Sequence, residues 1–356
     1  MDKRWYKLAD ILVNYSTKVK KGDKVAIAMY EAHTEDLVTA LVEKVVKAGA
    51  FPQIQFLSEK IRHKLLLYGN KEQLTRVPDL EMFSIEWCDV YFGIRGGFNL
   101  GETYDIEDEK RTMNQIVNGK ISKARWDKTR WCLIRVPNSD MASKANLSYE
   151  SLQDNFFNSC FLDFNSKMDE WNIYKNVLEK GDKVRIVTND TDLSFSVKNR
   201  KWVIFNGIMN LPDGEIATAP ITDTINGYIK FKNPAVLGGQ LFNNVRLEWE
   251  NGKLKQYYSS NNQELLGQIL YSDSGASLIG EFAFGLNYGL KDFCYDILLD
   301  EKIGGTVHIA LGRAYKECGG INDSSIHWDI ILDTRNNAVI YLDNIEIFKN
   351  GKFLLG

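Results

Sequence analysis

Proline and cysteine are scarce in this sequence of 356 residues. Six prolines and no low-complexity stretch indicate that little of the chain is disordered. The five cysteines are odd in number and none is spaced as C-x-x-C, which argues against a disulfide framework and against a thiolate zinc site. We therefore expect reduced and mostly buried thiols, as in a cytoplasmic protein.

An excess of one charge and a long apolar run are also missing. The sequence has 44 Lys and Arg against 47 Asp and Glu, so the formal net charge is only -3. No basic field is available to bind a phosphate backbone or an anionic membrane. No apolar run approaches the roughly 18 residues that a membrane helix needs. These absences predict a soluble, cytoplasmic protein whose partners include neither nucleic acid nor a membrane.

The length favours two domains, and the pattern of the first 140 residues is typical of an open α/β sheet. Segments with apolar residues at helical spacing alternate there with short apolar segments that read as buried strands. No glycine-rich phosphate loop follows these strands, so we expect a scaffold and not a nucleotide site. The helical segments are 8–19 and 35–48, and the strand candidates are 25–29, 53–56, 89–94 and 131–135.

The pattern changes after Gly181 to short alternating segments that are separated by Asp, Asn or Gly, which indicates a mainly β half. We place the domain boundary there. The predicted fold is α/β to α+β, with an open α/β domain over 1–181, including bridging helices within 148–180, and a β-rich domain over 182–356.

Histidine is scarce enough for its settings to be informative. A strand over 326–333 would project His327 and Asp329 from one face and Trp328 from the other. An imidazole beside a carboxylate fits the first coordination shell of Zn, Co, Mn or Fe. A core histidine beside a surface aspartate would give the same pattern. The four histidines are His33, His63, His308 and His327.

His308 lies in a second strand candidate, 306–312, where Ala310 and Gly312 leave room beside the imidazole. Tyr315 follows shortly afterwards, and its phenol could stabilise an oxyanion if the loop returns it towards a metal. The alternative for this tyrosine is a packing role.

Glu215 and Glu281 each follow a glycine and precede apolar residues, an unusual setting for surface charge. Such a carboxylate is expected to be partly buried and then needs a cation, a metal or a proton. Each Gly-Glu pair is a weak signal by itself. Together with His308, His327 and Asp329, the two glutamates supply the ligand complement of a two-metal hydrolytic centre.

These segments resemble the metallopeptidase family of aminopeptidase T and aminopeptidase S, and the match extends from the N-terminal domain to the C-terminus. By this resemblance Glu215, Glu281, His308, His327 and Asp329 fall on the family's metal ligands, and Tyr315 falls on its active-site tyrosine. Glu301 is a further ligand candidate. The strongest segments, in the family's order, are 210–220, 280–287, 308–315 and 325–329.

The resemblance implies a homodimeric metalloaminopeptidase whose β-rich domain is catalytic and whose substrate is a peptide with a free N-terminus. Two divalent ions (Zn, Co or Mn), bridged by one carboxylate, would activate a water, and Tyr315 would stabilise the oxyanion. The segment between Glu281 and His308 is slightly shorter than in long members of the family, so substrate preference stays open.

Two other functions fit part of this pattern. Two imidazoles and one carboxylate also form the iron triad of a mononuclear non-haem dioxygenase, such as one that cleaves hydroxypyridine rings. An iron triad has no need of Glu215 and Glu281 together, which favours the peptidase. A metal-binding protein without catalysis is the third interpretation.

Overall fold

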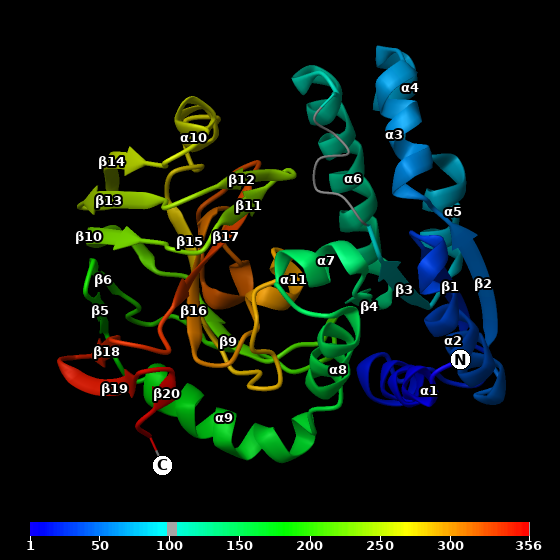
Figure 1. Ribbon diagram of the computed structural model, residues 1–356, viewed down its shortest axis with the longest axis horizontal. Helices are drawn as coiled ribbons and strands as arrows, with labels where there is room; N and C mark the ends of the chain where they lie inside the picture. Colours follow the sequence, from blue (N-terminus) through cyan, green and yellow to red (C-terminus); the bar gives the residue numbers. More distant parts are fainter. Residues whose placement is uncertain (98–104, 356) are drawn as a thin grey trace. The chain divides into compact units, whose positions relative to one another are not determined.

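The computed structural model describes residues 1–97 and 105–355 and divides them into two compact units (Figure 1). The first unit comprises residues 1–161 and 207–212, and the second comprises 162–206 and 213–356. In the described part of the chain, no helix is long and apolar enough to cross a membrane.

The first unit is built on a five-stranded parallel sheet with the order β2-β1-β3-β4-β8. Two of its three inner strands, β1 and β3, are almost entirely buried, as parallel strands are when helices cover both faces. This confirms the predicted open α/β sheet. The strands are β1 (Lys24–Met29), β2 (Phe51–Phe56), β3 (Val90–Arg95), β4 (Arg130–Arg135) and β8 (Asn210–Leu211).

The helices of the first unit follow ordinary start and stop signals. Helix α2 (Glu35–Lys47) has acidic residues in its first turn and lysines in its last, which complements the helix dipole. The other helical segments are α1 (Lys3–Asp10), η1 (Ile11–Ser16), η2 (Ala32–Thr34), α3 (Glu59–Tyr68), α4 (Lys71–Thr75), α5 (Asp79–Trp87), α6 (Asp108–Lys128), α7 (Ser139–Lys144) and α8 (Tyr149–Cys160).

The second unit contains two antiparallel sheets and a hairpin. The larger sheet has the order β14-β13-β10-β6-β5-β18-β19-β20, and the smaller has the order β17-β16-β15-β9-β7. The strands are β5 (Lys183–Thr188), β6 (Thr191–Ser196), β7 (Val203–Phe205), β9 (Glu215–Thr218), β10 (Ile221–Lys230), β11 (Ala235–Leu237), β12 (Gln240–Phe242), β13 (Arg246–Glu250), β14 (Lys253–Tyr258), β15 (Ile279–Gly285), β16 (Thr306–Gly312), β17 (His327–Asp333), β18 (Val339–Leu342), β19 (Ile345–Lys349) and β20 (Lys352–Phe353).

Aromatic side chains fill the core between these two sheets. Phe282 on β15 packs against Phe195 on β6 at 5.1 Å, and Phe284 packs against Phe348 on β19 at 5.3 Å between ring centroids. Because strand residues alternate, Glu281 and Ala283 point to the opposite face of β15. The smaller sheet therefore has one apolar core face and one face on which polar groups gather.

Helix α9 (Phe164–Leu178) belongs to the second unit, although the predicted N-terminal domain includes it. The Tyr174 ring stacks on Phe353 at 4.2 Å between centroids, and Glu179, just after the helix, accepts a hydrogen bond from the Trp202 backbone. That the chain folds as two independent domains on either side of Gly181 stays a prediction. The remaining helical segments are α10 (Gln263–Leu270), α11 (Ile297–Asp300) and η4 (Lys316–Cys318).

Candidate metal centre

The polar face of the smaller sheet gathers all five predicted metal ligands. Pairing between strands places Glu281 opposite Ala310, and Ala310 opposite Asp329. His308 lies opposite Ala283, and His327 lies opposite Gly312. Small residues thus stand between the functional side chains, so that imidazoles and carboxylates converge across neighbouring strands. The predicted strands around His308 and His327 are confirmed as β16 and β17.

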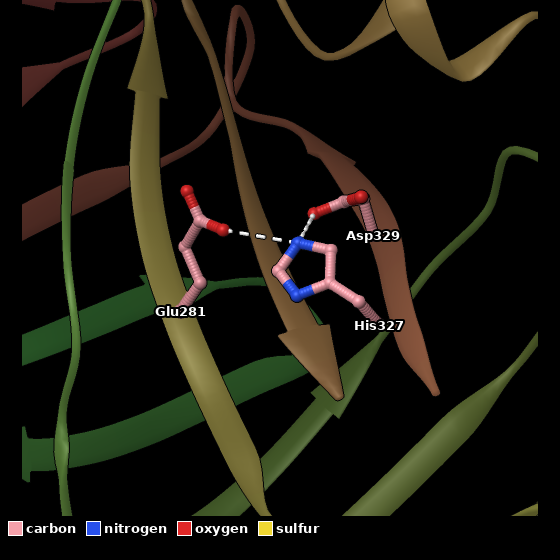
Figure 2. A group of neighbouring side chains, drawn as sticks. All are labelled: Glu281, His327 and Asp329. Atoms are coloured by element: carbon pink, nitrogen blue, oxygen red, sulfur yellow. Dashed lines mark ion pairs between the residues drawn. The ribbon is translucent and has the colours of Figure 1, made fainter. Parts of the chain in front are cut away.

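Glu281, His327 and Asp329 form the first ligand group (Figure 2). His327 Nε2 lies 3.2 Å from Glu281 Oε2 and 3.3 Å from Asp329 Oδ1. Its Nδ1 lies 2.8 Å from the Arg313 carbonyl oxygen, which can only accept, so Nδ1 donates. This outer bond fixes the ring and directs Nε2 at the two carboxylates, as is usual for a histidine that binds a metal.

Glu301, His308 and Asp329 form the second ligand group, so the two groups share Asp329. His308 is 1% exposed, and its Nε2 lies 3.9 Å from both Asp329 Oδ1 and Glu281 Oε1. Those separations are too long for hydrogen bonds. They suit an ion, because ligand atoms that each lie roughly 2.1 Å from one tetrahedral zinc are about 3.4 Å apart.

Glu215 belongs to neither group but lies beside the second. Its Oε2 is 3.7 Å from His308 Nε2 and has no hydrogen-bond partner among the described residues. Its Oε1 accepts a 2.5 Å hydrogen bond from Lys302 Nζ. A buried carboxylate oxygen without a partner is costly, so this atom indicates a place for a cation.

Lys302 is a residue of the site that the sequence analysis missed. Its side chain is 1% exposed, and Nζ lies 2.7 Å from Glu301 Oε1 and 3.7 Å from Asp213 Oδ1, in addition to Glu215. Burial acts to lower the lysine pKa, but Glu215, Glu301 and Asp213 together hold it well above its usual range. Its position next to Glu301 and two residues before the glycine pair Gly304-Gly305 is the only sequence signal, and it is a weak one.

The negative charge of the buried carboxylates in this cluster exceeds the positive charge of Lys302. Burial raises the pKa of Glu215 to about 8. Burial acts to lower the pKa of His308, but the nearby carboxylates of Glu281, Glu215 and Asp329 raise it to about 9. Without metal the cluster therefore binds protons, and a metal ion that takes these ligands must displace them. The donor set and its electrostatics fit divalent cations.

Tyr315 lies next to the first ligand group, half-buried, with its ring centroid 5.2 Å from that of His327. Burial raises the pKa of its phenol well above the usual value, and Glu281, Asp329, Glu301 and Glu215 add to the effect. The phenol therefore keeps its proton near neutral pH and can donate a hydrogen bond.

Asp273 anchors the segment that leads into His327. Its carboxylate accepts hydrogen bonds from the backbone and hydroxyl of Ser325 at 2.9 and 2.8 Å and from the Ser324 hydroxyl at 3.0 Å. Burial acts to raise the Asp273 pKa, but these bonds and one from the Gly275 backbone lower it to about 2. The stabilising contribution is therefore present above the unfolded pKa of 3.8 and is lost as pH falls through about 2.

Replacing Asp273 by Asn is expected to lower the free energy of unfolding by about 1 kcal/mol at pH 7, because the charge-assisted bonds to Ser324 and Ser325 are lost. Urea unfolding at several pH values measures this, with the exposed Asp169→Asn as control. The difference from wild type is expected to narrow as pH falls from about 4 to about 2, because the Asp273 carboxylate of the unfolded chain is protonated there before that of the folded protein. A difference that is independent of pH would show that the charge of Asp273 has no part in it.

Comparison with known proteins agrees with this geometry. The model of a family described as thermophilic metalloprotease (M29) matches residues 1–353. Aminopeptidase T of Thermus thermophilus is 33% identical over 168 residues, which is 41% of this chain and 40% of that protein. Aminopeptidase AmpS of Bacillus subtilis is 26% identical over 167 residues, or 40% of each. The matched region thus spans about two fifths of these relatives.

A solved structure, wild-type AmpT from Thermus thermophilus, has the same fold. It superposes with a TM-score of 0.84 over 99% of both chains, at 19% sequence identity. The fold match covers both units, and the family match covers nearly the whole chain. On the strength of that full-length match, the chain belongs to the thermophilic metalloprotease family M29.

Proposed function

We propose that this protein is a metal-dependent aminopeptidase that removes single residues from the free N-terminus of peptides. The observation that carries the proposal is the pair of ligand groups, Glu281–His327–Asp329 and Glu301–His308–Asp329, which share Asp329 on one face of a sheet. Two ions held so close together suit hydrolysis of a peptide bond. A mononuclear iron triad would leave several of these carboxylates without a role.

Glu215, Glu281, His308, His327 and Asp329 would hold the ions, and Glu301 is added to them as a sixth candidate. Glu281 would hold an ion with either oxygen, because its two oxygens face different histidines: Oε1 lies 3.9 Å from His308 Nε2, and Oε2 lies 3.2 Å from His327 Nε2. Two divalent ions in this cluster would supply an acidified water and polarise the scissile carbonyl.

The chain's own groups have three tasks in this proposal. The phenol of Tyr315, which keeps its proton, donates a hydrogen bond to the oxyanion that forms when water adds to the carbonyl. The Arg313 carbonyl holds the His327 ring in place through Nδ1. The surplus of carboxylates attracts the α-ammonium group of an unblocked peptide, which favours cleavage after the first residue.

The proposal extends to a homodimer in the cytoplasm, as the resemblance to the aminopeptidase T and S family implies. The near balance of acidic and basic residues supports a small peptide and not a polyanion as the ligand.

Metal content tests the proposed centre. Protein equilibrated with an excess of zinc, cobalt or manganese is expected to bind two equivalents of the ion per chain by elemental analysis. Chelation should remove turnover of an amino-acid arylamide, and these ions should restore it. In the proposed mechanism the bound ions activate the water and polarise the scissile carbonyl. One equivalent of iron, with oxygen uptake on a hydroxylated aromatic ring, would contradict the proposal.

A further inference from the structure

Lys302 is a permanent cation at one side of the ligand cluster. Its Nζ binds Glu215 Oε1 at 2.5 Å and Glu301 Oε1 at 2.7 Å. The side chain is 1% exposed, so water does little to weaken these contacts. The lysine and its two glutamate partners are therefore a fixed part of the site.

Lys302 faces only one of the two ligand groups. Glu301 pairs with Lys302 and also belongs to the group with His308 and Asp329. Among the described residues, no ion pair joins Lys302 to Glu281 or Asp329. The first group thus has two carboxylates without a lysine in contact, whereas the second has a carboxylate that already binds an ammonium group.

We propose that Lys302 is a positioning residue that makes the two ion positions unequal. The ion at Glu281, His327 and Asp329 binds first and tightly. The ion at Glu301, His308 and Asp329 binds second and more weakly. This inference rests on the proposed function, because it requires that the cluster holds two ions.

The physical reason is competition for the same carboxylate. The ammonium group of Lys302 takes a lone pair of Glu301 that an ion would otherwise use, and it repels a second cation at short range where water is excluded. The two oxygens of Glu215 also have different roles. Oε1 accepts a hydrogen bond from Lys302, whereas Oε2 has no hydrogen-bond partner among the described residues and lies beside His308. Lys302 thus orients Glu215 for the second ion while it weakens that ion's binding.

An exchangeable second ion has a consequence for the enzyme. Its occupancy would follow the free metal concentration, so that turnover would rise and fall with metal supply while the first ion stays bound. Without the lysine, the five carboxylates Asp213, Glu215, Glu281, Glu301 and Asp329 would attract both ions strongly.

The test is a titration of metal-free protein with Mn²⁺ at fixed pH and salt, with free Mn²⁺ followed by electron paramagnetic resonance. Wild type is expected to bind two ions whose dissociation constants differ by about tenfold or more. Lys302→Gln keeps a hydrogen-bond donor without the charge and is expected to bring the two constants within about threefold, by tightening the weaker one. The exposed Lys349→Gln is the matched control, and Lys302→Arg, which keeps the charge, should retain the difference.

Equal constants in wild type would overturn the inference, as would weaker binding of the second ion in Lys302→Gln or loss of the difference in Lys302→Arg. If Lys302→Gln does not fold, the titrations of wild type and Lys302→Arg still test the inference, because both proteins are expected to bind two ions with unequal dissociation constants. Failure of the proposed function is distinguishable: a protein without peptidase activity can still bind two unequal ions, and an active aminopeptidase can bind two equal ones. A single bound ion would overturn both.

Discussion

Glutamine in place of Glu281 is expected to abolish measurable peptidase activity, with kcat/KM lowered by more than about 10²-fold. Loss of an outer partner of a metal ligand typically costs 10 to 100-fold, and loss of a ligand should cost more. Glu281 faces both histidines with separate oxygens, and an amide would turn its NH₂ group towards one of them. The variant should also bind less than the two equivalents of metal expected of wild type.

The side chain of Glu281 is buried on a rigid strand, so folding must be checked separately by circular dichroism and thermal unfolding. Glu346→Gln, at a surface ion pair on β19, is the matched control and should behave as wild type. Full metal content together with full turnover in Glu281→Gln would remove this residue from the proposed site.

Phenylalanine in place of Tyr315 is expected to lower kcat by about 10²-fold or more while metal content and fold stay unchanged. Removal of one oxyanion donor typically costs about 3 to 4 kcal/mol in the transition state, and only the hydroxyl is deleted here. Steady-state kinetics on an amino-acid arylamide, beside elemental analysis, measures both. The exposed Tyr258→Phe is the control. A kcat within about twofold of wild type would leave Tyr315 with a packing role alone.

The strands that hold the site could be predicted because their alternation is local. In 326–333, apolar residues alternate with His327 and Asp329, and β17 buries Trp328 and Ile330 while the two polar side chains face the cluster. The same holds for His308 on β16. Burial of Glu215 and Glu281 also followed from their apolar neighbours, and both are less than 5% exposed, at 4% and 3%.

Lys302 could not be predicted in the same way. Its contact with Glu215 joins residues that are 87 positions apart, and no local pattern shows that two such segments meet. A lysine beside a glutamate is typical of a surface turn. Its burial becomes visible only in the fold, where β9 pairs with β15 and the Asn287 backbone, just after β15, donates a hydrogen bond to the Lys302 carbonyl. The position of β8 was hidden for the same reason, because its pairing with β4 joins distant parts of the sequence.

The domain to which helix α9 belongs could not be predicted from helical periodicity alone. Its residues follow the helices of the first unit in sequence, and helical spacing does not say which core a helix packs against. The stacking of Tyr174 on Phe353 depends on the far C-terminus of the chain. A boundary drawn where helices give way to strands therefore differs from one drawn by packing.

A matched pair of peptides tests aminopeptidase action most directly. Metal-loaded enzyme would be incubated with a free peptide and with its N-acetylated form, and release of single residues would be followed by mass spectrometry. Acetylation removes both the charge and the lone pair of the α-amine, so the blocked peptide should not bind productively. We expect stepwise trimming of the free peptide from its N-terminus and no cleavage of the acetylated one. Equal cleavage of both peptides, or cleavage at internal bonds, would contradict the proposed function.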